Sequence, residues 1–336
     1  MPTTEVGRRT PTEQGAAARV LLVGLAVLAV VAGTGVMIYT GAGPFPDPDG
    51  CRAEVGDVVV ELSTEQAENA TTIAAVAVRR GLPARAVSIA LATAYQESKI
   101  VNLDSGDRDS LGLFQQRPSQ GWGTTDQVQD PYYATNAFYD ALQEIEGYQQ
   151  MRITEAAQQV QRSGFPEAYE DHAEDARALA SALTGYSPAT FTCVAEPPLS
   201  DVGVEQPTAT GLTPRADEVR VDLEEAFGQL ALGGFAAGGV STGHIKGSAH
   251  YAGRAIDVFV RPVNEANNRA GWAMAHYLAA HAHRLLIDNV IFDDRIWTTG
   301  SRSEEGWRDY NAPSGSDDRV ILEHRDHVHV DVLEGG

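Results

Sequence analysis

The sequence predicts a multidomain protein with an N-terminal transmembrane helix, an all-α domain and then an α+β domain. An uncharged apolar run fills residues 20–39, which is long enough for one helix to cross a bilayer. Two segments rich in proline, glycine and polar residues, 40–50 and 194–211, separate the remainder into residues 51–193 and 212–336. Apolar residues recur at helical spacing in the first of these regions, and at both helical and strand spacing in the second.

The charges around the apolar run predict its orientation. Arginines precede the run and aspartates follow it, at Arg8, Arg9, Arg19, Asp47 and Asp49. The positive-inside rule then makes residues 1–19 a cytoplasmic tail and places both domains outside the membrane. A cleaved signal peptide is the alternative, but the run exceeds the roughly 7–15 apolar residues of a signal peptide. We therefore expect a single-pass protein of the cell membrane with extracytoplasmic domains.

Composition and cysteine content narrow the class of protein. Of the 336 residues, 43% are hydrophobic and 21% are charged, so the chain can bury cores. The net charge of -21 argues against nucleic acid as a partner, because phosphate binding needs an excess of Lys and Arg. Cys51 and Cys193 are the only cysteines and lie at the two edges of the first domain, so outside the cytoplasm we expect a disulfide between them. No feature selects an oligomeric state.

The first domain is expected to be helical throughout. Ser63 and Gln66 have the spacing of a capping box, which predicts a helix from there to Gly81. Residues 86–97 are apolar on nearly every side, which is typical of a helix inside a domain. Further helices are predicted over residues 132–146, 153–161 and 170–183.

The second domain mixes helices and strands. Helices are predicted over residues 214–227 and 266–284, and strands over residues 254–260, 289–297 and 327–332. In the last strand His327, His329 and Asp331 share one face, and the alternating valines share the other. The valines are expected to face the core, which leaves the imidazoles on the opposite surface.

A set of metal-binding side chains is predicted in the second domain. In the segment SAHYAGRAIDV (248–258), a turn through Gly253 lets His250 fold back near Asp257. Two histidines and one carboxylate, with a water in the fourth position, are typical of a catalytic zinc site.

These motifs resemble those of a known family. SxHxxGxAxD followed by a C-terminal HxH strand is similar to the zinc D-Ala-D-Ala carboxypeptidases and their Hedgehog-type relatives. The resemblance implies that His250, Asp257 and His329 bind Zn²⁺ and that a zinc-activated water attacks an amide carbonyl, with His327 left as a rival ligand. Family members place the general base three residues before the last ligand, at Asp326 here, and some relatives use a histidine five residues before it, at His324. We favour Asp326, and we keep His324 and His327 as candidates for supporting a ligand or stabilising the transition state.

A second resemblance lies in the first domain. A Glu–Ser pair at Glu97 and Ser98, followed by a Gly-Leu-Phe-Gln segment ending at Gln115, resembles the lysozyme-like lytic transglycosylases and goose-type lysozymes. The resemblance implies that Glu97 is the general acid/base and that Ser98 and Gln115 position the sugar or Glu97. Desolvation at the end of a buried helix would raise the pKa of Glu97, as a general acid requires. The tyrosine usual in a later family motif is replaced by Gln161, and Tyr169 is a candidate substitute.

Both resemblances point to one polymer, because one implies glycan cleavage and the other peptide cleavage. We therefore expect a membrane-anchored peptidoglycan remodelling enzyme. The alternative is a non-catalytic cell-wall binding or assembly protein, in which one or both domains only recognise peptidoglycan.

Overall fold

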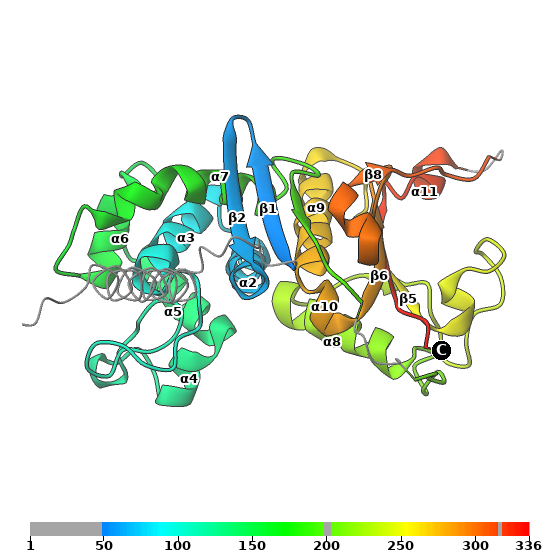
Figure 1. Ribbon diagram of the computed structural model, residues 1–336, viewed down its shortest axis with the longest axis horizontal. Coiled ribbons are helices and arrows are strands. Elements are labelled where there is room, and N and C mark those ends of the chain that lie inside the picture. Colours follow the sequence, from blue (N-terminus) through cyan, green and yellow to red (C-terminus); the bar gives the residue numbers. More distant parts are fainter. Residues whose placement is uncertain (1–48, 198–202, 315–317, 336) are drawn as a thin grey trace, which may run out of the picture. The chain divides into compact units, whose positions relative to one another are not determined.

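A small antiparallel sheet opens the part of the chain described by the computed structural model, which comprises residues 49–197, 203–314 and 318–335. Its strand order is β2-β1-β3, with bounds β1 (Gly50–Val55), β2 (Val58–Ser63) and β3 (Phe191–Cys193) (Figure 1). The prediction of an all-α first domain is therefore wrong. A turn at Gly56, whose φ is 60°, reverses the chain, and the valine-rich run after it has the β-branched residues that favour strands.

Helices predominate in residues 64–197, which together with the small sheet we call the N-terminal part. They are α2 (Thr64–Arg79), α3 (Ala84–Ser98), α4 (Thr125–Gln129), α5 (Pro131–Gln143), α6 (Ile153–Gln161) and α7 (Ala173–Leu183), with 3-10 turns η1 (Pro118–Gln120) and η2 (Ala168–His172). The predicted capping box is confirmed, because Ser63 and Gln66 bond reciprocally at the start of α2. The predicted interior helix is α3, whose residues from Ala86 to Ala94 are all buried.

The predicted disulfide is confirmed. Cys51 and Cys193 are opposite each other on β1 and β3 and are bonded. The bond ties the beginning of the N-terminal part to its end, so it closes a loop whose ends are 142 residues apart.

Removing the disulfide is expected to lower stability. A variant with Cys51→Ala and Cys193→Ala should lose about 2–4 kcal/mol of the free energy of unfolding, because the unfolded chain gains the freedom that the closed loop denies it. Urea unfolding of the variant and the wild-type protein measures this difference. Equal unfolding midpoints at equal slope would contradict the expectation.

A six-stranded antiparallel sheet forms the centre of residues 203–335, the C-terminal part. Its order is β4-β5-β9-β6-β7-β8, with bounds β4 (Leu232–Gly233), β5 (Ala255–Phe259), β6 (Ile287–Phe292), β7 (Arg295–Thr298), β8 (Arg308–Asp309) and β9 (His327–Val332). The other elements are α8 (Pro214–Phe227), η3 (Ala249–Ala252), α9 (Glu265–Ala280), α10 (Ala282–Leu285), η4 (Gly300–Glu305) and α11 (Arg319–Leu322). The single strand predicted over 289–297 is instead a hairpin, because Asp293 and Asp294 adopt positive φ and turn the chain between β6 and β7.

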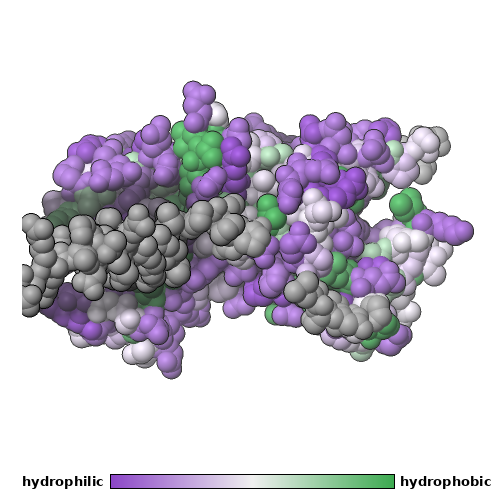
Figure 2. All heavy atoms as spheres, in the orientation of Figure 1, coloured by the Kyte–Doolittle hydropathy of each residue, from purple (hydrophilic) through white to green (hydrophobic). Residues whose placement is uncertain are grey.

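Helix α9 packs on one face of this sheet and against α2 of the N-terminal part (Figure 1). The Tyr132 and Tyr277 hydroxyls are 2.8 Å apart, and the indole of Trp297 donates to the Cys193 carbonyl at 3.1 Å. The described residues from Asp49 onward therefore form one compact unit. The division into two domains stays a prediction. The face in Figure 2 is largely hydrophilic, with hydrophobic residues in small separate groups.

The predicted membrane anchor requires correction. Residues 20–39 lie outside the described residues, and among the described helices none is long and apolar enough to cross a membrane. The longest of these, α2 and α9, have 16 residues each, fewer than the roughly 20 that a bilayer requires. We therefore withdraw the transmembrane fold class and the single-pass membrane localisation.

Candidate functional site

Two central strands and one 3-10 turn position the predicted ligands. Asp257 on β5 is directly opposite His329 on β9, and His250 lies on η3 just before β5. The valines of β9 are buried in the core that contains α9, as predicted, so the histidines of that strand occupy the other face. The structure thus brings together His250, Asp257 and His329, three residues that the sequence spreads over about 80 positions.

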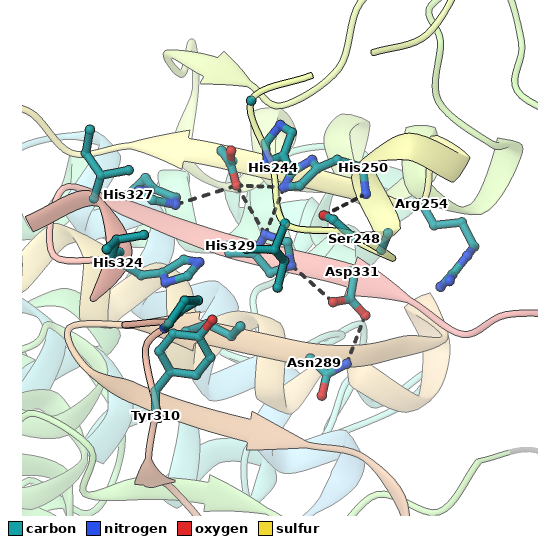
Figure 3. A pocket seen from close by; sticks show the side chains of 18 of the residues that line it. His244, Ser248, His250, Arg254, Asn289, Tyr310, His324, His327, His329 and Asp331 are labelled. Atoms are coloured by element: carbon teal, nitrogen blue, oxygen red, sulfur yellow. Dashed lines mark hydrogen bonds and ion pairs between the residues drawn. The ribbon is translucent and has the colours of Figure 1, made fainter. Parts of the chain in front are cut away.

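The donor atoms of these residues form a nearly equilateral triangle. His250 Nε2 is 3.1 Å from His329 Nδ1, and Asp257 Oδ1 is 3.2 Å from each of these nitrogens (Figure 3). Bonds of 2.0–2.1 Å to a tetrahedral zinc ion place its ligand atoms about 3.3 Å apart. The spacing therefore fits a single metal ion bound by all three side chains.

Hydrogen bonds orient both imidazoles toward the centre of the triangle. His250 Nδ1 lies 2.8 Å from the Gly234 carbonyl, so it carries the proton and leaves Nε2 as the acceptor. His329 Nε2 donates to Asp331 Oδ2 at 3.1 Å, and Asn289 holds the other oxygen of that carboxylate at 3.0 Å. Metal-binding histidines commonly donate their second N–H to a carbonyl or a carboxylate in this way.

Gly234 is required by the close approach of its backbone to the site. Its φ is 79°, and a Cβ there would lie 2.4 Å from Cε1 of His250 and 2.9 Å from Asp257 Oδ2. Glycine meets both demands, because it adopts positive φ freely and has no side chain to displace the imidazole.

The pKa of Asp257 is lowered and that of His329 is raised, so the triangle favours the charged form of both side chains. Burial opposes ionisation of Asp257, but the neighbouring imidazoles of His250 and His329 outweigh burial and hold its pKa far below the usual range. Burial also opposes the charged form of His329, yet hydrogen bonds to Asp257 and Asp331 raise its pKa to about 9. A proton and a metal ion would therefore compete for the same nitrogen.

A fourth side chain, His244, joins this group without having been predicted. His244, His250 and Asp257 each offer one ligand atom within 4.8 Å of the others, so this His–His–Asp group could hold a metal ion. The His244 ring stacks on that of His250, with centroids 3.8 Å apart (Figure 3). The only signal in the sequence is its position six residues before His250 in a glycine-rich segment.

The predicted general base, Asp326, does not line the cavity that contains the triangle. Asp326 is buried, accepts from Arg261 Nε at 2.6 Å and from His327 Nδ1 at 2.8 Å, and is not among the cavity-lining residues. His327 does line the cavity, and its Nε2 is 3.8 Å from Asp257 Oδ1. Asp326 as the base stays a prediction, and its contact with Nδ1 orients the ring of His327.

His324 also lines the cavity. Its Nδ1 is buried without a hydrogen-bond partner among the described residues, and the ring of Tyr310 meets it edge-on at 5.0 Å. Burial, with the neighbouring His329 and His327, lowers its pKa to about 3. A neutral imidazole of this kind can accept or donate one hydrogen bond to a substrate.

The cavity has a volume of about 490 Å³ and contains both polar and apolar lining. Its basic lining residues besides histidine are Arg254 and Arg261. Ile245 and Ile321 also line it and are 57% and 48% exposed, which is unusual for large apolar side chains. The cavity can therefore take a ligand that has both polar and apolar surface.

In the N-terminal part, Glu97 occupies the last turn of α3. The Tyr169 hydroxyl donates to its Oε1 at 2.7 Å, and Tyr169 as a substitute for the family tyrosine stays a prediction. Burial raises the pKa of Glu97, and hydrogen bonds from Tyr169 and Gln161 only partly oppose this. Gln161 also donates to the Phe114 carbonyl at 2.7 Å, which ties the end of α6 to the Gly-Leu-Phe-Gln loop.

The other two predicted residues of this region bond to the backbone instead. Ser98 donates to the Leu113 carbonyl at 2.7 Å, and Gln115 donates to the Gly112 carbonyl at 3.3 Å. Ser98 is buried, so its hydroxyl fixes the loop against α3. Their predicted contact with sugar stays a prediction.

One comparison with known proteins gives a match. A protein-family profile described as VldE, C-terminal domain, matches residues 208–321. The matched range contains His244, His250 and Asp257, ends before His324 and β9, and covers less than half of the chain. No curated protein matches the chain. The similarity therefore concerns the C-terminal part alone.

Proposed function

We propose that the C-terminal part is a zinc-dependent peptidase domain. The observation that carries this proposal is the triangle of His250 Nε2, Asp257 Oδ1 and His329 Nδ1, with sides of 3.1–3.2 Å. These three atoms would hold the ion, and bound zinc supplies a Lewis acid for a carbonyl and lowers the pKa of a water. The two-histidine, one-carboxylate set with room for a further ligand is the donor set of catalytic zinc sites.

The protein's own residues would accept the proton of the attacking water and pass it to the leaving amine. His327 Nε2 is free to accept a proton from the attacking water, because Asp326 holds the Nδ1–H of the same ring. The carboxylate, itself paired with Arg261, stabilises the imidazolium that forms. The departing amine would then receive this proton from the same nitrogen. His324 faces the same cavity and is placed to hydrogen-bond the substrate.

We further propose peptidoglycan as the substrate, with Glu97 cleaving the glycan strand. Support comes from the Glu–Ser and Gly-Leu-Phe-Gln motifs, the raised pKa of Glu97 and the hydroxyl of Tyr169 that fixes its carboxyl group. A protonated carboxyl group can donate to a glycosidic oxygen near neutral pH. Two activities on one chain would then act on the two components of the same polymer.

Metal removal tests this proposal and separates the two activities. We expect the purified full chain to contain one zinc ion and to release new amino groups from peptidoglycan. Chelation should abolish that release, and added Zn²⁺ should restore it, while glycan cleavage continues in the chelator because Glu97 needs no metal. Amino-group release that persists without metal would contradict the peptidase proposal.

A non-catalytic wall-binding role is the second candidate for the N-terminal part. The observation in its favour is that Ser98 and Gln115, the predicted positioning residues, hydrogen-bond to backbone carbonyls. Co-sedimentation with peptidoglycan in the absence of any released glycan fragment would support this alternative.

A further inference from the structure

His244 differs from the other residues of the centre in how the chain holds it. His250, Asp257 and His329 sit on η3, β5 and β9, whereas His244 lies in the segment 234–247, outside any helix or strand. Five glycines of this segment have positive φ, namely Gly234, Gly238, Gly239, Gly243 and Gly247. A Cβ added at any of the last four would meet nothing within 4 Å. Glycines in open surroundings let this segment change its course at little cost.

The imidazole of His244 is available to a ligand. Within the described ranges, the backbone of His244 bonds to the Tyr251 hydroxyl. The His244 N–H donates to that hydroxyl at 3.1 Å, and the hydroxyl donates to the His244 carbonyl. The ring nitrogens of His244 form no hydrogen bond within those ranges, although the ring is stacked on His250 and one nitrogen lies within 4.8 Å of the ligand atoms of His250 and Asp257. A neutral imidazole beside two predicted ligands has a free lone pair for the same ion.

We propose that His244 is a fourth, displaceable protein ligand of the metal, a role that rests on the zinc site proposed above. Four protein ligands close a zinc site, whereas a catalytic site keeps one position open. With His244 bound, the site would be closed to water and substrate. With His244 withdrawn, the three ligands on η3, β5 and β9 would keep the ion and leave one position open.

The neighbouring residue supplies a reason for substrate to withdraw it. Ile245 lines the same cavity, is 57% exposed and belongs to the same glycine-rich segment. In the proposed switch, an apolar substrate group that covers Ile245 would bind the segment in its withdrawn position better than in its closed one. Such a difference in affinity shifts the population toward the open site.

Metal binding and cobalt spectra of the full chain test this proposal. Compared with the wild-type protein, His244→Ala should weaken Zn²⁺ affinity at least about tenfold. It should also change the visible spectrum of the Co²⁺-loaded protein and increase the affinity of the bound cobalt for azide, since one position opens. His283→Ala, which alters an exposed histidine of α10, should leave all three unchanged. His244→Gln, which keeps a polar side chain of similar length, repeats the test if the alanine variant fails to fold.

The outcomes separate this proposal from the one it rests on. If the wild-type protein binds no zinc, or if His250→Ala binds it equally well, the zinc site itself is refuted and His244 with it. If wild-type protein binds zinc and His250→Ala does not, but His244→Ala and His244→Gln keep wild-type affinity and cobalt spectrum, only the fourth ligand is refuted.

Discussion

Replacing His329 with alanine is expected to abolish both zinc binding and amino-group release from peptidoglycan. His329 supplies one corner of the donor triangle, 3.1 Å from His250 Nε2 and 3.2 Å from Asp257 Oδ1. Removal of a residue that only supports a ligand costs roughly 10–100-fold in metal affinity. Loss of the ligand itself should therefore weaken zinc binding by more than about 100-fold. Competition with a chelator of known affinity, together with an assay of released amino groups, measures both effects.

Two further variants show whether the loss arises from metal coordination. Asp331→Asn keeps the size of the side chain that holds His329 Nε2, so it should reduce zinc affinity by a smaller factor, about 10-fold. The exposed His283 on α10 provides the matched control, because His283→Ala should bind zinc as the wild-type protein does. Wild-type zinc affinity in His329→Ala would refute the triangle as the metal site.

The strand and helix signals with a clear period were sufficient to predict the longer helices and two central strands of the C-terminal part, but not its short elements. The alternation of HVHVDV gives β9 with the predicted bounds, because one face of valines must be buried against α9. The helix predicted over residues 214–227 has the observed bounds of α8, since Thr213 caps it and Pro214 begins it. In the sheet β2-β1-β3, strand β3 was missed because it has three residues and pairs with a strand about 140 positions earlier. Strands β1 and β2 form a local hairpin, and the valine-rich run of β2 was a strand signal that the prediction passed over.

Local sequence predicts the positions of the three triangle residues, but not the surroundings of the predicted general base. His250 and Asp257 are close in sequence, and the alternation of β9 places His329 on the face opposite the core. The motif and the strand alternation are therefore enough to predict that these three residues meet. Asp326 comes just before β9, where the alternation of a strand no longer predicts which way a side chain points. Its carboxylate contacts Arg261, a residue that follows β5 and that no local pattern connects with it. His244 lies outside any helical or strand pattern, because only the path of a glycine-rich segment stacks its ring on that of His250.

Replacing Glu97 with glutamine is expected to abolish glycan cleavage and to leave the zinc-dependent release of amino groups intact. Glutamine keeps an oxygen that can accept the Tyr169 hydroxyl, but it has no acidic proton to give. Loss of general acid catalysis should reduce the rate about 10²–10⁴-fold. Chromatography of the soluble fragments measures the rate, and it also separates anhydro-sugar ends, made by a lyase, from the reducing ends made by a hydrolase.

The raised pKa of Glu97 gives this prediction a second, independent readout. Glycan cleavage by the wild-type protein should fall as the pH rises through that pKa, because the carboxyl group acts while protonated. A carboxyl group whose folded pKa exceeds its unfolded one favours folding at low pH and opposes it once ionised. At neutral pH, Glu97→Gln should therefore unfold at the same temperature as the wild-type protein or a higher one.

Two neighbouring variants decide whether Glu97 acts as the acid or only shapes the fold. Glu174→Gln, which changes an exposed carboxylate at the start of α7, should leave the rate and its pH profile unchanged. Tyr169→Phe removes a hydrogen bond that lowers the pKa of Glu97, so the fall in cleavage should move to higher pH. A structural role alone would lower the rate of Tyr169→Phe without moving its pH profile. Unaltered glycan cleavage by a folded Glu97→Gln would assign the acid to another residue, because an amide side chain cannot protonate a leaving oxygen.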